Sequence, residues 1–524
     1  MDINLHKNPA AASRKTICVG IVCFCLHATA QNKIVLHPGK TGDTISKNIY
    51  GHFAEHLGHG IYGGFYVGGS NQTIPNKNGV RLDVIEALKK LKIPVLRWPG
   101  GCFADTYHWK DGIGPKEKRP SMLNVWWGNV REDNSFGTNE FLDMCEELGA
   151  EPYLAVNVGS GTVQDVADWV KYVNYKKGTG PMPEMREKNG RTDPWHVKYW
   201  GIGNEAWGCG GNMTAEYYAN VYRQYATFMT NWNNGDHLFR IASGASDNDY
   251  HWTEVLMRDI PHGMLDGVAL HHYSVINWDK KGSATNFSED EYFATMERAS
   301  LMEEYIKRHG EIMDKYDPQK RVALVVDEWG GWYDVEAGTN GAFLYQQNTM
   351  RDAMIAGLTL NIFNNHCDRV KMANLAQCIN VLQAVILTNG EKIILTPTYH
   401  VMELYNVHQD AALIPLDIAS NEYKMAGKNL KAISASASRD KRGVVHISIV
   451  NIDAHTSQEV NIDLNGLDIK TVTGRILRST HLQDYNSFDN PEKIKPATFG
   501  DVRLSASHVN LSMPPFSVVV LELR

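Results

Sequence analysis

Apolar positions along the first three quarters of the chain alternate between a helical spacing and a strand spacing. The segment at 82–92, LDVIEALKKLK, places apolar residues three and four positions apart, which predicts an amphipathic helix. PVLRWPGG follows as a short apolar run ending in Pro and Gly, which is typical of a buried strand. The same pairing recurs as NEFLDMCEELG with EPYLAVNVG, VADWVKYVNY with VKYWGIGNE, AEYYANVYRQYATFM with RIASGAS, WTEVLMRDI with GVALHHYS, and MERASLMEEYIKRHG with RVALVVDEW. NIYGHFAEH precedes them as a first strand, and a helix near 351–360 leads into VKMANLAQ, so the pattern predicts eight strands separated by helices.

Alternating strands and helices predict a parallel sheet, and eight such units favour a closed (β/α)8 TIM barrel of the α/β class. The alternative is an open, doubly wound sheet. A glycine-rich GxGxxG turn would support that alternative, but none follows any of the predicted strands. We therefore expect a catalytic barrel over 49–392.

The pattern changes after about residue 395. Short alternating strands follow in VVHISIVNI, VNIDLNG, KTVTGRIL and FSVVVLEL, with no long helix beyond 399–407. These strands predict an all-β sandwich domain over 393–524. The segment 31–48 contains NKIVLHPG, which we expect to join the sandwich as an N-terminal strand. Because no low-complexity linker separates the two parts, we expect the barrel and the sandwich to pack together.

The N-terminal segment has the composition of an export signal. Arg14 and Lys15 precede the apolar run TICVGIVCFCL, which ends in an Ala-x-Ala site. This predicts a signal peptide over 1–30 with cleavage near Ala30, and a periplasmic or secreted protein. The apolar run is too short to span a bilayer comfortably, so no membrane association is expected once the leader is removed.

Composition narrows the classes of function. The chain has 524 residues, 43% of them hydrophobic, and a formal net charge of −7 without a basic run, which argues against a nucleic-acid partner. Five of the eight cysteines follow the predicted leader, without a CxxC or a Cys/His metal spacing. At most two disulfides can form among these five, and one thiol is left over.

Polar and aromatic residues collect where the predicted strands end. In a barrel the active site lies at the carboxyl ends of the strands, so these residues are candidates for the chemistry. Carboxylates, amides and aromatic faces together are typical of a sugar-binding site. In chain order they are His52, Glu55, His56, Arg97, Trp98, Asn157, Asn204, Glu205, His271, His272, Tyr273, Asp327, Glu328, Asn374 and Gln377.

Metal catalysis and a serine nucleophile are the rival chemistries. His52 and His56 are four residues apart, as in a zinc pair, but they lie in GHFAEHLGHG, where glycines break any helix that would align them. His271 and His272 are adjacent on a strand and point to opposite faces. No G-x-S-x-G elbow occurs in the chain. We expect no metal and no cofactor, and histidines that orient carboxylates.

Glu205 and Glu328 end the fourth and seventh predicted strands. A retaining glycosidase needs two carboxyl groups ~5 to 5.5 Å apart, one protonated and one ionised. The alternative is that each glutamate only caps its strand with an ion pair. Arg97 also has two interpretations, since it either bonds one of these carboxylates or forms a structural ion pair inside the barrel.

Six motifs in order resemble glycoside hydrolase family 51, the α-L-arabinofuranosidases, over nearly the whole of the chain after the leader. They are GHFAEHLGHGIYGG, RWPGGCFADTYHWKDGIGP, WGIGNEAWGCGG, HHYS, VDEWGGWY and NLAQCIN. The resemblance implies a (β/α)8 barrel with a C-terminal β-sandwich. It also implies that Glu205 is the general acid/base and Glu328 the nucleophile.

The resemblance assigns the remaining site residues to substrate binding. Asn204 would bond the sugar O2, Glu55 and Gln377 would grip the ring, and Tyr273 would hold the nucleophile. Trp127 and Trp332 would form the wall on the aglycone side, although the pair of tryptophans at 126 and 127 leaves a one-residue ambiguity.

Two positions depart from the family pattern. Cys102 stands where many relatives have a sugar-binding Asn, so it either binds the sugar with reduced hydrogen bonding or is a small buried residue beside a tight turn. Gly330 and Gly331 replace bulkier residues before Trp332, which we expect to widen or loosen that loop.

These features predict a retaining exo-glycosidase that removes terminal α-L-arabinofuranosyl residues from plant polysaccharides or oligosaccharides such as arabinoxylan and arabinan. An arabinofuranosyl-bearing saccharide is therefore the expected partner, and the resemblance suggests a homo-oligomer, a hexamer. One alternative is an endo-acting β-glycanase of the same barrel clan. The other is a carbohydrate-binding protein without catalysis, against which the presence of both glutamates argues.

Overall fold

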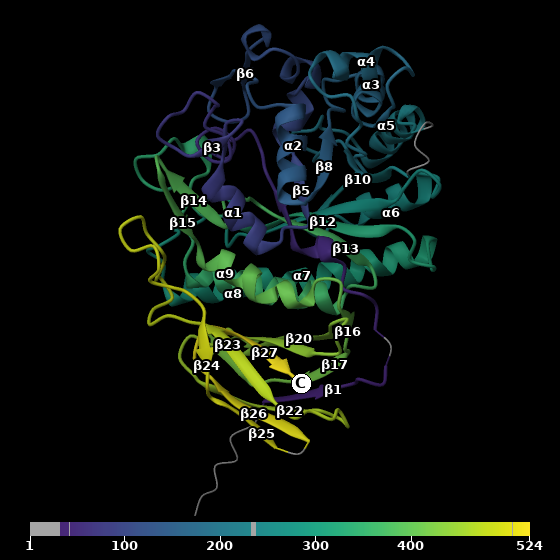
Figure 1. Cartoon of the computed structure of the whole chain (residues 1–524). Coiled ribbons are helices and arrows are strands. Elements are labelled where there is room, and N and C mark those ends of the chain that lie inside the picture. The colour runs from purple at the N-terminus through teal and green to yellow at the C-terminus, as the bar shows by residue number, and fades with distance from the viewer. Residues whose placement is uncertain (1–31, 41, 232–236, 506) are drawn as a thin grey trace, which may run out of the picture.

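The computed structural model describes residues 32–40, 42–231, 237–505 and 507–524, and its centre is a closed barrel of eight parallel strands (Figure 1). Each strand pairs with the next barrel strand along the chain, and the last pairs with the first to close the ring. The barrel predicted from the alternating pattern is confirmed. Its strands are β2 (Gly51–Phe53), β5 (Val95–Trp98), β8 (Glu151–Val156), β9 (Tyr199–Ile202), β10 (Phe239–Ser246), β11 (Gly267–Ser274), β12 (Ala323–Gly331) and β13 (Val370–Leu375).

Helices surround the barrel and bury their apolar faces against its strands. Those that the apolar spacing predicted are α1 (Leu82–Leu91), α2 (Thr138–Leu148), α3 (Val163–Asn174), α5 (Ala215–Phe228), α6 (Tyr250–Asp259), α7 (Glu289–Tyr316), α8 (Met350–Asn365) and α9 (Pro397–Tyr405). The structure adds α4 (Pro181–Lys188), which begins with a proline and buries only Pro183 and Arg186. Because so few of its positions face the core, α4 carries no apolar periodicity that the sequence could show.

The C-terminal domain is a sandwich of two antiparallel-rich sheets, as the short alternating strands predicted. One sheet contains, in spatial order, β17 (Leu416–Ala419), β1 (Asn32–Leu36), β22 (Gln458–Asp463), β26 (His508–Met513) and β25 (Val502–Ser505). The other contains β16 (Ala412–Leu413), β20 (Ile433–Arg439), β21 (Val445–Asn451), β27 (Ser517–Leu523), β23 (Val472–Leu477) and β24 (Ala497–Phe499). The N-terminal strand β1 therefore lies inside a sheet whose other strands all come from residues 416–513.

The loops between these elements contain short hairpins and 3-10 turns. Four two-stranded hairpins are β3 (Asn76–Lys77) with β4 (Val80–Arg81), β6 (Met122–Asn124) with β7 (Val130–Glu132), β14 (Ile386–Asn389) with β15 (Lys392–Leu395), and β18 (Glu422–Met425) with β19 (Lys428–Lys431). The 3-10 turns are η1 (Lys47–Tyr50), η2 (Cys102–Thr106), η3 (Trp109–Gly112), η4 (Lys116–Lys118), η5 (Gly341–Phe343) and η6 (Asn406–His408).

The sandwich packs directly against one side of the barrel. Helix α8 contacts β20, β21 and β27, and α9 contacts β23 and β27, so these two helices lie between the domains (Figure 1). Polar side chains cross the junction: the Asn364 amide donates to Ser436, and the Tyr292 hydroxyl donates to the backbone carbonyl of Ile452. The two domains therefore share a buried interface rather than a linker.

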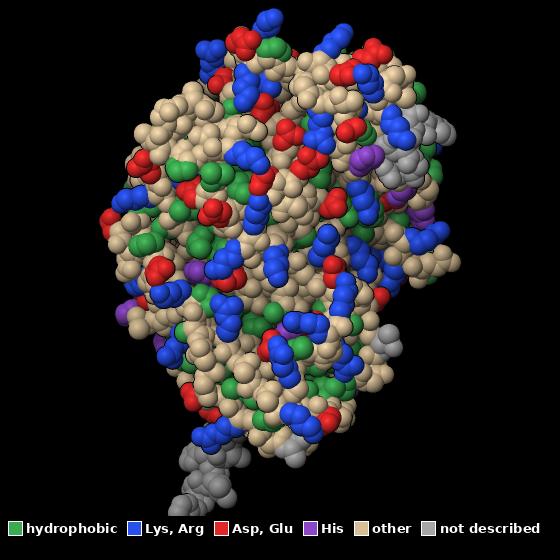
Figure 2. Space-filling model, in the orientation of Figure 1, with side chains coloured by type: hydrophobic (Ala, Val, Ile, Leu, Met, Phe, Trp, Pro, Cys, Tyr) green, Lys and Arg blue, Asp and Glu red, His purple; other side chains and the backbone are tan. Residues whose placement is uncertain are grey.

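The outer surface carries charges of both signs. Figure 2 shows Lys and Arg side chains intermixed with Asp and Glu over the face it presents. Within the described parts of the chain, no helix combines the length and the apolar character needed to cross a membrane. The predicted signal peptide at 1–30 lies outside the described residues.

Candidate active site

One small pocket at the carboxyl ends of the barrel strands contains every residue to which the sequence assigned a catalytic or substrate-binding role. The predicted residues that line it are Glu55, Cys102, Trp127, Asn204, Glu205, Tyr273, Glu328, Trp332 and Gln377. Leu57, Gly101, Leu344 and Leu382 complete its wall. These side chains come from six different strands or the loops that follow them, which only closure of the barrel brings together.

Glu205 and Glu328 face each other across this pocket. Glu205 follows β9 and Glu328 lies in β12, and a carboxylate oxygen of one is within 4.8 Å of a carboxylate oxygen of the other. The Glu205 side chain is 20% exposed and that of Glu328 is 7% exposed. Oxygens this close suit a retaining glycosidase, whose two carboxyl groups lie ~5 to 5.5 Å apart.

Both oxygens of Glu328 accept hydrogen bonds. The Tyr273 hydroxyl donates to Oε2 over 2.7 Å, and the Arg97 Nη1 donates to Oε1 over 2.8 Å. His271 Nδ1 lies 3.6 Å from Oε2. Donors around an ionised carboxylate favour the charged form, so this environment suits a group that must stay ionised.

Arg97 sits beneath the site and joins several of its groups. Besides Glu328, its Nη2 donates to Asn204 Oδ1 over 2.6 Å, and Nε lies 3.7 Å from Asp327. Burial alone would lower the pKa of Arg97, but the nearby carboxylates of Asp327 and Glu328 raise it above its ordinary value. The structure shows both interpretations of Arg97 together: it bonds the site carboxylate of Glu328 and forms a buried ion pair with Asp327.

His271 connects the two glutamates. Its Nδ1 lies 2.9 Å from Glu205 Oε1, and its Nε2 lies 3.1 Å from Asp327 Oδ1. Burial would lower the pKa of this imidazole, but the carboxylates of Glu328, Asp327 and Glu205 together raise it to about 10. A protonated His271 can donate to Glu205 and Asp327 at the same time.

The other three histidines near the strand ends, His272, His56 and His52, do not line the pocket. His272 points away from the pocket, with Nδ1 2.5 Å from Asp247, as adjacent positions on a strand require. His56 Nδ1 lies 3.0 Å from Glu132, so it does orient a carboxylate. His52 is fully buried, and burial lowers its pKa to about 3.

Glu55 is held by three donors on the opposite wall. The Trp127 indole N–H and the Phe103 backbone N–H donate to Oε1, and the Gln377 amide donates to Oε2 over 3.0 Å. These hydrogen bonds lower the pKa of Glu55, but burial and the charge of Glu328 outweigh them and raise it to about 7. The bond to Glu55 comes from Trp127, while Trp126 is 40% exposed.

The backbone that carries Glu205 is positioned by a residue that sequence reasoning missed. Asp105 accepts hydrogen bonds from the backbone N–H groups of Asn204, Val158 and Gly159. Burial raises the pKa of Asp105 to about 7. Glu205 has a φ of 39°, a left-handed conformation that is uncommon for a side chain of this size and is typical of functional sites. No pattern in the sequence marks Asp105, because its partners are backbone groups of two other loops.

Two glycines after β5 let the backbone approach the carboxylates. A Cβ at Gly100 would lie 2.5 Å from Glu55 Cγ, and a Cβ at Gly101 would lie 2.9 Å from Glu328 Oε1 and 3.3 Å from Asn204 Nδ2. Contacts this short exclude any side chain unless the carboxylates move. The PGG turn is therefore a requirement of the pocket itself.

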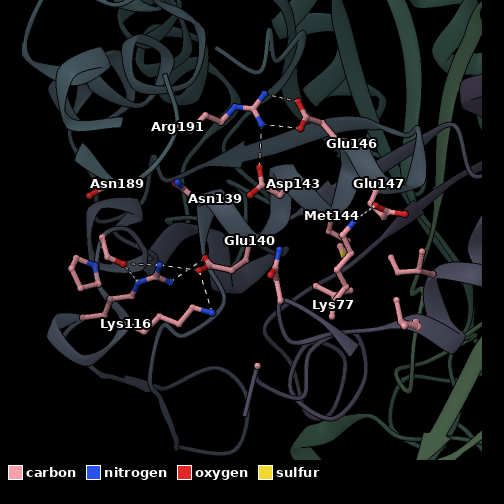
Figure 3. A pocket seen from close by; sticks show the side chains of 18 residues that line it. Lys77, Lys116, Asn139, Glu140, Asp143, Met144, Glu146, Glu147, Asn189 and Arg191 are labelled. Atoms are coloured by element: carbon pink, nitrogen blue, oxygen red, sulfur yellow. Dashed lines mark hydrogen bonds and ion pairs between the residues drawn. The ribbon is translucent and has the colours of Figure 1, made fainter. Parts of the chain in front are cut away.

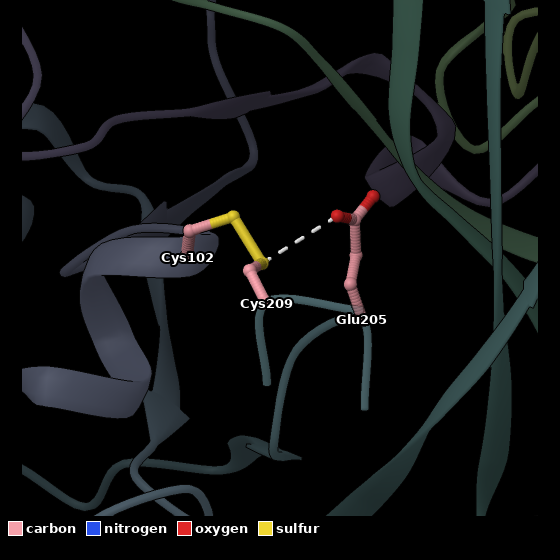
Figure 4. Close-up of side chains that lie close together, drawn as sticks. All are labelled: Cys102, Glu205 and Cys209. Carbon is pink, nitrogen blue, oxygen red and sulfur yellow. Dashed lines mark hydrogen bonds between the residues drawn. A yellow bond between two sulfur atoms is a disulfide. The ribbon is translucent and has the colours of Figure 1, made fainter. Parts of the chain in front are cut away.

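Cys102 forms a disulfide with Cys209, which corrects both interpretations of it as a thiol. The sulfurs are bonded across 107 positions of sequence, and the Cys209 sulfur lies 3.6 Å from Glu205 Oε2 (Figure 4). The pairing was not predicted because strand-end loops meet only in the folded barrel. The other cysteines in the described part of the chain, Cys145, Cys367 and Cys378, are free and buried.

Aromatic rings extend from the pocket toward solvent. The Trp332 ring packs edge-on against Tyr273, with centroids 5.1 Å apart, and against Trp278, with centroids 5.4 Å apart. Trp278 is 54% exposed. The three rings make a continuous apolar wall from the carboxylates to the surface.

The expectation that Gly330 and Gly331 loosen the loop is wrong. Both lie within β12 and are buried. The Gly331 N–H donates to Gln383 Oε1 over 2.7 Å, and a Cβ at Gly331 would lie 2.8 Å from the Tyr333 hydroxyl. These glycines make room for close packing and extend the strand up to Trp332.

A larger hollow lies on the outside of the barrel, beside α1, α2 and η4. It has a volume of about 860 Å³, and none of the predicted site residues lines it. Figure 3 shows its charged side chains bonded to one another, with Arg191 on Glu146 at 2.6 Å and Lys77 on Glu147 at 2.6 Å. Because these charges neutralise each other in pairs, the smaller pocket is the better candidate for catalysis.

Two family models match the chain. The model described as "Alpha-L-arabinofuranosidase 1 domain" matches residues 87–291, and the "Alpha-L-arabinofuranosidase C-terminal domain" matches residues 327–517. Among relatives, an "Intracellular exo-alpha-L-arabinofuranosidase" of Bacteroides ovatus is 51% identical over 95% of this chain and 97% of its own length. A "Probable alpha-L-arabinofuranosidase C" of Aspergillus niger is 32% identical over 86% of this chain and 90% of its own.

Solved structures agree with these relatives. A GH51 arabinofuranosidase from Xanthomonas axonopodis pv. citri superposes with a TM-score of 0.92 at 45% identity, covering 94% of this chain and 100% of that one. An α-L-arabinofuranosidase from Thermotoga maritima, solved as an arabinose complex, superposes with a TM-score of 0.82 at 31% identity, covering 94% and 99%.

The predicted location of the protein is wrong. The Bacteroides ovatus relative matches over nearly its whole length and carries the word "intracellular" in its name, which contradicts a periplasmic or secreted protein. Two basic residues before a short apolar run are a compositional signal only.

Proposed function

The chain belongs to the α-L-arabinofuranosidases of glycoside hydrolase family 51, and from this premise we propose that it is a retaining exo-glycosidase that releases terminal α-L-arabinofuranosyl residues. The observation that carries the proposal is the placement of Glu205 and Glu328, whose carboxylate oxygens come within 4.8 Å of each other. That separation suits direct attack by one carboxylate on the anomeric carbon while the other handles the leaving group.

The two glutamates then divide the reaction. Glu328 attacks the anomeric carbon and forms a glycosyl ester, while Glu205 gives its proton to the departing glycosidic oxygen. In the second step Glu205 takes a proton from water, the water oxygen attacks the anomeric carbon, and the bond to Glu328 breaks. The donors from Arg97 and Tyr273 support this assignment, because they stabilise Glu328 as a carboxylate.

The remaining pocket residues hold the sugar. Asn204 presents its Nδ2 to the pocket because its Oδ1 already accepts from Arg97, and we assign this N–H to the sugar O2. Glu55, fixed by Gln377 and Trp127, accepts hydroxyl hydrogens of the ring. Cys102 contributes to the wall as part of a disulfide, without a thiol to donate.

The shape of the site supports exo action on branched polymers. Glu55 is buried in the pocket wall, and Arg97 is buried next to it against Glu328 and Asn204, which supports a site for one terminal sugar rather than an open groove. Trp332 and Trp278 lie where the rest of the saccharide would leave the pocket, and their faces suit sugar rings. Arabinoxylan and arabinan side chains are the proposed substrates.

The test compares the wild type with Glu205→Ala and Glu328→Ala on an aryl α-L-arabinofuranoside. Loss of Glu328 is expected to abolish turnover. Loss of Glu205 is expected to spare substrates with good leaving groups and to be rescued by azide, which can attack the glycosyl ester without general base help. If Glu328→Ala instead yields a glycosyl azide of retained configuration, the two roles are exchanged.

Two results would reject the proposal in favour of the alternatives. Activity on a β-1,4-glucan with none on the aryl arabinofuranoside indicates an endo-acting β-glycanase. Tight binding of arabino-oligosaccharides with no release of arabinose indicates a carbohydrate-binding protein. A time course on arabinoxylan that releases only arabinose supports exo action.

Assembly is a separate proposal that rests on the family resemblance. We propose a homo-oligomer, a hexamer, and the test is the molar mass from light scattering or sedimentation. The mass of one chain is 58.8 kDa, so a monomer and a hexamer are readily distinguished. A monomer at all concentrations contradicts the proposal.

A further inference from the structure

Three potential metal ligands lie together at the mouth of the pocket. They are the sulfurs of Cys102 and Cys209 and a carboxylate oxygen of Glu205, all within 4.8 Å of one another (Figure 4). The two sulfurs are bonded to each other and cannot bind a metal in this state. Reduction of the disulfide turns the same atoms into two thiols beside a carboxylate.

We propose that the reduced protein binds a thiophilic divalent cation such as Zn²⁺ through Cys102, Cys209 and Glu205, and that the bound cation stops catalysis. The sequence did not indicate this site, because the cysteines are 107 positions apart and lack any metal-binding spacing. Zinc sites with three protein ligands keep a fourth position for water, and two of the three ligands here, Cys102 and Glu205, line the sugar pocket.

The distance between Cys209 and Glu205 already fits such a site. Bonds of ~2.3 Å from zinc to sulfur and ~2.1 Å from zinc to oxygen, at a tetrahedral angle, separate the two ligand atoms by roughly 3.6 Å. The Cys209 sulfur lies 3.6 Å from Glu205 Oε2. Thus only the Cys102 sulfur has to move, and the S–S bond that restrains it is the one that reduction breaks.

The elements that carry the ligands support a small movement. Cys102 begins η2, directly after the Gly100–Gly101 turn. Cys209 lies four residues after Glu205 in the loop that follows β9, and this loop closes on itself through the bonds from the Gly208 and Gly210 N–H groups to the Glu205 carbonyl. Glu205 and Cys209 are therefore held together as a pair, whether or not the disulfide is present.

The chemistry needs one external reductant. A dithiol reductant transfers two electrons to the disulfide, its own thiols close to a disulfide, and their two protons pass to the Cys102 and Cys209 sulfurs. Zn²⁺ then displaces both thiol protons, because the thiolate is the form that binds the metal. Oxidation of the thiols by a disulfide oxidant reverses the first step and releases the cation.

The inhibitory part of this inference rests on the proposed role of Glu205. A Glu205 carboxylate bound to zinc has no proton to give to the leaving oxygen and cannot accept one from water. The metal-binding part does not depend on that role. Direct measurement of binding therefore separates a failure of the metal site from a failure of the catalytic assignment.

A neighbouring set of groups provides the main rival site. Glu205, His271 and Glu328 also place ligand atoms within 4.8 Å of one another, and they do so without any change in the disulfide. A cation held there would inhibit the oxidised and the reduced protein equally. The effect of reduction distinguishes the two sites.

The experiment titrates Zn²⁺ into the oxidised protein and into protein reduced with a phosphine, which is removed before the titration. The reduced wild type is expected to bind one additional equivalent and to lose activity at zinc concentrations that leave the oxidised form active. A chelator restores activity without reoxidation. With Co²⁺ as the probe, a sulfur-to-cobalt charge-transfer band is expected only in the reduced protein.

Two variants and one control identify the ligands. Cys209→Ser and Glu205→Gln are expected to weaken zinc binding in the reduced protein by more than the roughly 10-fold to 100-fold that loss of an outer-shell partner costs. Cys378→Ser removes a free, buried cysteine outside the pocket and is expected to leave the zinc response unchanged. Equal zinc affinity of oxidised and reduced wild type, or a cobalt band that persists in Cys209→Ser, overturns the proposal.

Discussion

At the scale of single residues, the two site glutamates differ in what surrounds them. Glu328 accepts hydrogen bonds from the guanidinium of Arg97 and the hydroxyl of Tyr273. Glu205 instead contacts one imidazole nitrogen of His271 and one sulfur of the disulfide, that of Cys209. The donors stabilise negative charge on Glu328. These different neighbours support the two different roles that we propose for the glutamates in a double displacement.

Tyr273→Phe tests the hydrogen bond that the Tyr273 hydroxyl donates to Glu328. Removing the hydroxyl leaves Glu328 Oε2 without its 2.7 Å donor, and hydrogen bonds to charged groups contribute about 1.5 to 3 kcal/mol. We expect kcat on an aryl α-L-arabinofuranoside to fall roughly 10-fold to 100-fold. Tyr217→Phe, at a tyrosine that is 61% exposed, is the matched control and should behave as wild type. An unchanged kcat in Tyr273→Phe would show that the phenol does not support the nucleophile.

Glu55→Gln tests the opposite wall. The Glu55 carboxylate faces N–H donors from Trp127, Phe103 and Gln377, and an amide would turn its own NH2 group toward at least one of them. We expect a KM at least roughly 10-fold higher, with a smaller change in kcat, because the residue holds the ring rather than the reacting bond. Steady-state kinetics measure both KM and kcat. A selective loss of kcat at constant KM would contradict a role in binding.

At the scale of elements, the turn after β5 determines how closely the backbone approaches the carboxylates. Gly100 and Gly101 abut Glu55 and Glu328 at distances that exclude a side chain. The sequence showed the PGG motif and its place at a strand end. It could not show which atoms the glycines face, since these belong to Glu55, 45 positions before Gly100, and to Glu328, 227 positions after Gly101.

Gly101→Ala tests this close approach. Its Cβ would lie 2.9 Å from Glu328 Oε1, so the carboxylate or the turn has to shift. A displacement on the order of 1 Å at a reacting group can cost about 100-fold in rate, and we expect a loss of that order in kcat/KM. Gly263→Ala, where a Cβ meets no atom within 4 Å, is the control. Comparable activity of both variants would show that the turn yields without moving Glu328.

Local patterns predicted most of the elements, and the exceptions have physical causes. The long amphipathic helices follow from apolar spacing, because each buries one face against the core. The barrel strands follow from short continuous apolar runs, because strands such as β5, β9 and β12 are buried on both faces. Helix α4 was missed because it packs through only two residues. We expected Gly330 and Gly331 to loosen a loop. In the structure they belong to β12, and their lack of side chains allows the strand to pack closely against Gln383.

At the scale of the whole molecule, the barrel and the sandwich are joined by buried polar contacts. His408, at the end of α9 and η6, lies between the Ser438 and Ser448 hydroxyls of the sandwich, with its nitrogens 2.7 and 2.6 Å from them. Burial lowers the pKa of His408 to about 3. The folded protein thus holds this imidazole neutral well below the pH at which the unfolded chain protonates it.

Acid destabilisation tests the junction. Between pH 6.5 and 3 the unfolded state binds a proton at His408 that the folded state does not, so the free energy of unfolding falls as the pH falls through this window. The loss amounts to about 2 kcal/mol between pH 6.5 and 5 for one such histidine. Unfolding of His408→Gln is expected to depend less on pH than that of the wild type.

The control for this prediction is an exposed histidine. His251→Gln, at a side chain that is 67% exposed, should keep the pH dependence of the wild type. If the free energy of unfolding falls equally with pH in His408→Gln and in the wild type, His408 at the junction does not cause the acid sensitivity. His52, which is also buried with a pKa of about 3, contributes in the same direction in both proteins.

The sequence by itself determined the barrel, the sandwich, the family and the residues around the pocket. This is possible because apolar periodicity is a local property and because the motifs at the strand ends are contiguous. Tertiary structure alone decided the contacts between those motifs: the bond from Arg97 to Glu328, the bridge of His271, the support from Asp105 and the disulfide of Cys102 with Cys209. Each of these joins strand ends far apart in the chain, and closure of the barrel is what brings them within bonding distance.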